Sequence, residues 1–127
     1  MKLLEMFHDW EEIEEYRART VIFSERDSAD AMYIVISGEV ELTLLNEPLG
    51  MESEGGMIGE MAMLVPTATR SATATTLSKV KLARLDHDEF KALITGNTEF
   101  SLHVMAVLAN RLRAVDQYIS TQFAQFR

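Results

Sequence analysis

The sequence predicts a mainly antiparallel β domain with helical segments at both ends. Between residues 20 and 85, short runs rich in Val, Ile, Thr and Tyr alternate with Gly, Asp, Asn and Ser, which is typical of short strands joined by turns. Most of these runs have no segment between them that is long enough for a crossover helix, which disfavours a parallel sheet. Apolar residues recur at helical spacing before and after the strands. We therefore expect a sandwich, barrel or jelly roll flanked by helices.

The composition fits one soluble domain over residues 1–127 and excludes several classes of partner. The chain is 47% hydrophobic, has no cysteine and carries a formal net charge of −8. The absence of cysteine excludes disulfides and thiolate metal sites and fits a reducing compartment. The negative charge, without a cluster of Lys and Arg, opposes binding to nucleic acid or anionic lipid. No apolar stretch approaches the ~20 residues of a membrane span. We expect a cytoplasmic protein with no direct nucleic-acid partner and no membrane contact.

The predicted elements follow in order along the chain. Residues 2–16 place apolar side chains at helical spacing among acids, which predicts a short amphipathic helix. A β roll over about residues 18–86 follows, with strands in "TVIF", "AMYIVIS", "EVELTLL", "SATATT" and "VKLARL". Asp86 and Glu89 have the spacing of a capping box, and Gly96 can end the helix that they begin.

A long helix over about residues 98–125 has the strongest periodic pattern, and Asn97 or Thr98 can cap it. One stripe alternates spacings of three and four, as in a two-helix seam, and comprises Met105, Leu108, Leu112, Val115 and Ile119. A second stripe, offset by one position, could pack on the β domain: Phe100, Val104 and Val107. The seam predicts a homodimer, and the alternative is a single amphipathic helix docked on its own core.

The stretch "GGMIGEMAMLVPTATRSATATT", residues 55–76, has the features of an anion site. A glycine-rich entry precedes a very short helix over Glu60 to Leu64, which ends before Pro66. The first turn of a helix offers backbone N–H groups, and Gly59 lets a ligand approach closely. Arg70 follows among small residues, where its guanidinium could bind phosphate oxygens in a bidentate manner. We expect Arg70 and the N–H groups to hold a phosphate, with Glu60 accepting hydrogen bonds from a neighbouring hydroxyl.

Beyond these features, "IGEMAML", a five-residue gap and "RSATATT" resemble the phosphate-binding cassette of the cyclic nucleotide-binding domain family. The likeness covers nearly the whole chain, because "TVIFSERDSADAMYIVISGEVEL" is similar to the family's opening strands and "LARLDHDEFKALI" to the helix after its last strand. The resemblance implies an antiparallel double-stranded β-helix, or jelly roll, with flanking N- and C-terminal helices. The cassette would span residues 56–73, and the last helix would form the dimer interface and cover the nucleotide base.

By position, the resemblance also implies roles for single residues. Glu60 would accept the ribose 2′-hydroxyl, and Arg70 would pair with the cyclic phosphate. Further ligand-binding positions would be Gly59, Met61 and Ala62 through their backbone, Ser71 and Ala72 after the arginine, and Val115 and Asp116 near the base. Arg19 and Arg26 depart from the family, which usually has glycine there; if the turns are unchanged, both residues are strained.

We thus expect a non-enzymatic, stand-alone cyclic nucleotide sensor that favours cAMP, with cGMP as the other candidate. It would signal through its C-terminal helix to a second copy or to an effector protein, with no cofactor besides the ligand. No metal is expected, because the histidines, His8, His87 and His103, lack metal-ligand spacing. There is no Walker motif and no nucleophile elbow. The alternative is a structural or protein-interaction domain of the same fold that no longer binds nucleotide.

Overall fold

The structure, a computed structural model, describes residues 3–65 and 69–124. The chain forms two compact units, one ending at Lys91 and the other beginning at Ala92. The elements in chain order are α1 (Leu3–Met6), β1 (Ile13–Tyr16), β2 (Val21–Phe23), β3 (Ala31–Ser37), β4 (Val40–Leu44), β5 (Glu47–Glu52), β6 (Met57–Ile58), α2 (Met61–Leu64), β7 (Thr73–Thr76), β8 (Val80–Asp86), α3 (His87–Gly96) and α4 (Thr98–Ala124).

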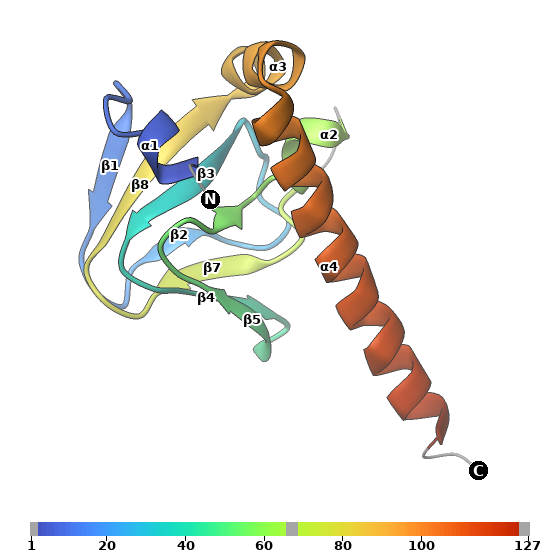
Figure 1. The fold of residues 1–127 in the computed structure, drawn as a ribbon. Coiled ribbons are helices and arrows are strands. Elements are labelled where there is room, and N and C mark those ends of the chain that lie inside the picture. Colours follow the sequence, from blue (N-terminus) through green and yellow to red (C-terminus); the bar gives the residue numbers. More distant parts are fainter. Residues whose placement is uncertain (1–2, 66–68, 125–127) are drawn as a thin grey trace. The chain divides into compact units, whose positions relative to one another are not determined.

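The first unit contains two antiparallel sheets of four strands each (Figure 1). Their strand orders are β1-β8-β3-β6 and β2-β7-β4-β5, so each sheet joins strands that are distant in the sequence. The five predicted runs correspond to β2, β3, β4, β7 and β8. This arrangement confirms the expected antiparallel β fold.

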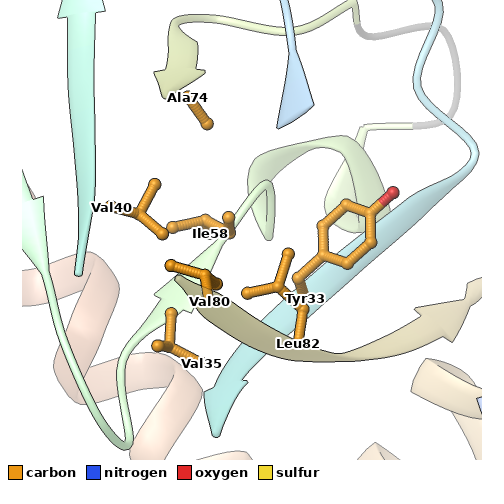
Figure 2. Close-up of a cluster of buried hydrophobic side chains, with 7 residues drawn as sticks. All are labelled: Tyr33, Val35, Val40, Ile58, Ala74, Val80 and Leu82. Atoms are coloured by element: carbon orange, nitrogen blue, oxygen red, sulfur yellow. The ribbon is translucent and has the colours of Figure 1, made fainter. Parts of the chain in front are cut away.

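Both sheets contribute side chains to one hydrophobic cluster (Figure 2). The cluster comprises Tyr33, Val35, Val40, Ile58, Ala74, Val80 and Leu82. Phe23, Tyr16, Ile22 and Leu42 are partly buried and pack against it. Burial of a Val or Leu side chain contributes about 1.5–3 kcal/mol. The cluster therefore holds the two sheets face to face and supports the strands next to the cassette.

The predicted helix over residues 2–16 is wrong for most of its length. Helix α1 ends at Met6, and Ile13–Tyr16 forms strand β1, which pairs with Val80–Ala83 of β8. The acids assigned to the polar face of a helix instead contact basic side chains of β8. Glu15 lies 3.6 Å from Lys81, and Glu12 lies 3.1 Å from Arg84. Local spacing could not reveal this pairing with a strand so far along the chain.

Strand β5 was not predicted, because Pro48 and Gly50 interrupt its pattern. It lies at the edge of its sheet, the position where a strand tolerates proline. A two-residue turn precedes it, with Leu45 at φ 52° and Asn46 at φ 67°. Positive φ at both positions is typical of the type I′ hairpin turn. The run "EVELTLL" therefore ends one residue early, since its last leucine belongs to the turn.

The predicted caps are confirmed. The amide of Glu89 donates to Oδ1 of Asp86 at 2.8 Å, and the amide of Asp86 donates to Oε1 of Glu89 at 3.0 Å, which is a reciprocal capping box. At α4, the amide of Phe100 donates to Oδ1 of Asn97 at 2.9 Å. The choice left open between Asn97 and Thr98 is thus settled for Asn97.

The two stripes of α4 differ in exposure. Phe100 and Val104 are buried, whereas four of the five seam residues are exposed in this single chain, namely Met105, Leu112, Val115 and Ile119. Leu112 reaches 66% exposure. Within the described residues, no helix alone is both long and apolar enough to cross a membrane, and α3 with α4 meets that test only as a bent pair.

Replacing Asp86 with Ala should lower the free energy of unfolding by about 0.5–2 kcal/mol, because the first turn of α3 loses its side-chain acceptor. Asp88→Ala removes another acid from the same turn and should cost less, since the side chain that accepts from the Glu89 amide belongs to Asp86. Urea denaturation of both variants measures the difference. Equal losses would contradict the role assigned to the capping box.

Candidate functional site

Arg70 lies between α2 and β7, and backbone hydrogen bonds join it to the loop between β2 and β3. Its amide donates to the carbonyl of Asp27 at 2.9 Å, and its carbonyl accepts from the amide of Arg26 at 2.8 Å. Arg26 has φ 72° and Arg19 has φ 61°, so both predicted departures from glycine adopt the left-handed conformation. Such backbone costs of order 1–3 kcal/mol and persists where surrounding contacts fix it. The strained turn at Arg26 therefore fixes the position of Arg70.

The Arg70 side chain is only 5% exposed and lies against aromatic rings. Its Cζ is 4.1 Å from the centroid of the Phe23 ring and 6.0 Å from that of Tyr33. The two rings are stacked, with centroids 6.2 Å apart. Both Phe23 and Tyr33 also belong to the packing around the central cluster. The guanidinium is thus supported by the hydrophobic core itself.

The charge of Arg70 is incompletely compensated. Nε and Nη1 are buried without a hydrogen-bond partner among the residues that the structure describes. Burial lowers the pKa of the Arg70 guanidinium from its ordinary value, and Tyr33, Asp30 and Asp27 oppose part of that change. The intrinsic pKa of arginine is so high that the group stays charged at neutral pH. A buried cation with unused donors is suited to an anionic ligand.

Gly59 lies beside this guanidinium. It has φ 77°, and a Cβ at this position would lie 2.5 Å from Nη1 of Arg70 and 3.5 Å from its Cζ. Any side chain there would have a strained backbone and would require the end of the Arg70 side chain to shift. The next residue, Glu60, has 0% exposure. The structure therefore brings the start of the cassette against Arg70, as predicted for a shared site.

The short helix in the cassette is confirmed as α2, and Val65 after it is extended at φ −118°. We expected unpaired backbone N–H groups in its first turn, but two of these groups are paired. The amide of Ala62 donates to the carbonyl of Gly59 at 3.3 Å, and that of Met63 to Glu60 at 3.0 Å. The turn closes on itself at these positions, so the N–H group of Ala62 is engaged inside the protein.

The remaining predicted positions divide between the two units. The hydroxyl of Ser71 lies 3.9 Å from Sδ of Met61, so these two exposed side chains lie side by side, while Ala72 is buried. Val115 and Asp116 lie on α4 in the second unit, and their part in the site stays a prediction. Residues 66–68 of the cassette lie outside the described residues.

Sequence reasoning missed two supports of the site. The ring of Phe23 lies under the Arg70 guanidinium. The amide of Glu25 donates to Oγ1 of Thr73 at 3.0 Å. The carboxylate of Glu25 also accepts from the amide of Leu45 at 3.2 and 3.3 Å. An apolar residue ending "TVIF" was visible as a strand residue. Its contact with Arg70 depends on the pairing of β2 with β7, which no local pattern reveals.

Gly59→Ala should destabilise the protein more than Gly55→Ala, in a comparison of unfolding free energies. Both glycines have positive φ, so each variant carries a backbone cost of about 1 kcal/mol. A Cβ on Gly55 meets nothing within 4 Å, whereas one on Gly59 clashes with Arg70. The clash should add to that cost, because the buried Arg70 side chain must shift away from Gly59. Equal stability of the two variants would contradict the expectation that Gly59 is needed to hold the Arg70 side chain in place.

Comparison with known proteins gives the fold and the family. The cyclic nucleotide-binding domain family matches residues 13–97. The CRP-like cAMP-activated global transcriptional regulator of Mycobacterium tuberculosis is 30% identical over 105 residues, which are 78% of this chain and 46% of that protein. The chain thus spans about half the length of the curated relatives it matches.

Solved structures share the architecture. The catabolite activator protein of Thermus thermophilus aligns with a TM-score of 0.80 and 28% identity, over 95% of this chain and 59% of that one. The cAMP-bound form of the EAL enzyme Bd1971 aligns with a TM-score of 0.62 and 29% identity, over 91% and 32% of the two chains. The predicted jelly roll with flanking helices is confirmed. Because the family match extends over more than half of the sequence and includes both Glu60 and Arg70, this chain belongs to the cyclic nucleotide-binding domain family.

Proposed function

We propose that the chain is a non-enzymatic sensor of a cyclic nucleotide, with cAMP as the favoured ligand and cGMP as the other candidate. The observation that carries the proposal is the buried guanidinium of Arg70, which has unused donors and lies against Gly59 in the cassette. A cyclic phosphate carries one negative charge and matches one arginine. The name of the M. tuberculosis regulator supports cAMP as the ligand, and the cAMP-bound and cGMP-bound forms of Bd1971 support a cyclic nucleotide of either kind.

The proposed binding chemistry divides between two buried charged residues. Arg70 pairs with the phosphate in surroundings where water screens the attraction weakly. Glu60 accepts a hydrogen bond from the ribose 2′-hydroxyl, and the backbone at Gly59, Met61 and Ala62 lies along the ligand. No covalent bond is made or broken, so binding acts by changing the populations of the protein's conformations.

The signal leaves through α4. Val115 and Asp116 contact the base, with Asp116 accepting a hydrogen from the adenine amino group, while the seam residues pair with a second copy of the chain. Binding and helix arrangement are then linked, since a ligand that favours one arrangement must bind it more tightly. The receiver is the second copy or a separate effector protein. We propose a cytoplasmic location, with neither nucleic acid nor membrane as a direct partner of this chain.

Calorimetry with cAMP, cGMP and 5′-AMP tests the ligand. We expect saturable binding of cAMP and weaker binding of 5′-AMP, whose second phosphate charge fits a one-arginine site poorly.

Arg70→Ala should weaken the binding free energy by about 2–5 kcal/mol, or roughly 30- to several-thousand-fold in affinity, and Glu60→Ala should weaken it less. Arg17→Ala removes an exposed arginine and should leave affinity unchanged. Absence of heat with every cyclic nucleotide would favour the alternative, a protein-interaction domain of the same fold.

Light scattering with and without nucleotide tests the dimer. The wild-type chain should have the mass of a dimer, because the exposed seam on α4 is a large apolar surface for a lone helix. Lys at both Leu112 and Ile119 should give a monomer with weaker nucleotide binding. A monomeric wild-type chain would rule out the seam, and a dimer whose Lys variant binds nucleotide unchanged would remove the coupling alone.

A further inference from the structure

We propose that Phe23 is a positioning residue: its ring holds the Arg70 guanidinium beside Gly59, oriented for the phosphate before the ligand arrives. This inference rests on the proposed function and extends it to a residue outside the cassette. It starts from two neighbours of the same guanidinium. The Phe23 ring centroid lies 4.1 Å from Cζ, and Nη1 occupies space that a Cβ on Gly59 would need. Together they form a slot for the side chain.

The slot is built on a single backbone frame. Phe23 is the last residue of β2, and its Cα pairs with Ala74 of β7. Arg70 precedes β7, and its backbone bonds to Arg26 and Asp27, which follow β2. Ring and guanidinium are therefore both positioned by the β2–β7 pairing. Their distance does not depend on a flexible linker between separate parts of the fold.

Burial explains why such a slot is needed. An arginine side chain loses substantial rotamer freedom when fixed, and a guanidinium with unpartnered donors is better solvated in water. Arg70 is nevertheless 5% exposed, with Nε and Nη1 lacking partners among the described residues. A cation within ~6 Å of a ring centroid is attracted to the aromatic face, more strongly when desolvated. The Phe23 ring offsets part of the desolvation cost.

An aromatic ring suits this site better than a carboxylate would. A carboxylate in contact with Arg70 would neutralise the charge that the phosphate requires and would occupy its donors. Within residues 3–65 and 69–124, Arg70 takes part in no ion pair shorter than 4.0 Å, while the carboxylate of Asp30 lies 3.3 Å from Nη2 of Arg84. The ring stabilises the cation without adding a negative charge. Tyr33, at 6.0 Å, is at the limit of such an interaction.

Three variants test the inference. Phe23→Leu keeps an apolar side chain but removes the ring, and Phe23→Tyr restores a ring. Phe7→Leu is the matched control, because this buried ring packs on Trp10, with centroids 4.8 Å apart. Thermal unfolding establishes that each variant is folded. Phe23→Met replaces the Leu variant should that one fail to fold.

The first readout needs no ligand. The Nε–H signal of Arg70 in a ¹H–¹⁵N spectrum, assigned by its loss in Arg70→Lys, should carry a ring-current shift in the wild-type chain. Phe23→Leu should remove that shift, Phe23→Tyr should retain it, and Phe7→Leu should leave it in place. A signal unchanged by Phe23→Leu would overturn the inference whatever the ligand.

The second readout is the affinity for cAMP. Phe23→Leu should weaken binding by roughly 2- to 30-fold, the range of a cation–π contact. Phe23→Tyr should restore affinity, and Phe7→Leu should lower the unfolding temperature without changing affinity. Wild-type binding with unchanged affinity in Phe23→Leu would overturn the inference and leave the proposed function standing. A wild-type chain that binds no cyclic nucleotide would overturn both, and this is how the two failures are told apart.

Discussion

The site depends on the burial of one positive charge. Arg70 is shielded from water, although two of its nitrogens have no hydrogen-bond partner in the described part of the chain. A lone buried cation of this kind is unfavourable unless the rest of the fold fixes it. Its backbone is bonded to the β2–β3 loop, and its side chain lies on a ring that packs against the hydrophobic cluster in Figure 2. Core stability and ligand recognition are therefore not separable at this position.

The two left-handed arginines have related positions in the fold. Arg19 precedes β2 and donates its amide to the carbonyl of Thr76 at 2.8 Å, while Arg26 follows β2 and donates to the carbonyl of Arg70 at 2.8 Å. The segment from Arg70 to Thr76 is thus bonded at both ends to turns that flank one strand. The strain at these turns accompanies hydrogen bonds that fix the register of β7. The arginine at the start of this segment is held in place as a result.

Sequence alone predicted those parts of the molecule whose signals are local. The strand runs, the capping box at Asp86 and the short helix before Val65 follow from neighbouring residues, and each is confirmed. The left-handed turn at Arg26 was implied by the resemblance to the family, which usually has glycine there, and its φ is positive. The strand over Ile13–Tyr16 was mistaken for helix because its partner lies in β8. Phe23 was missed for the same reason, since a contact between strands depends on their pairing. The parts of the site that depend on α4 stay predictions.

The order β1-β8-β3-β6 places the first and last strands of the chain side by side. The indole nitrogen of Trp10 donates to the carbonyl of Arg84 at 2.8 Å, across 74 positions of sequence. Contacts between such distant residues form late and slow the folding of small β proteins to milliseconds or seconds. During synthesis, β1 is therefore made well before β8 and stays unpaired until β8 has been synthesised. An unpaired strand of this kind is open to wrong pairing with other chains.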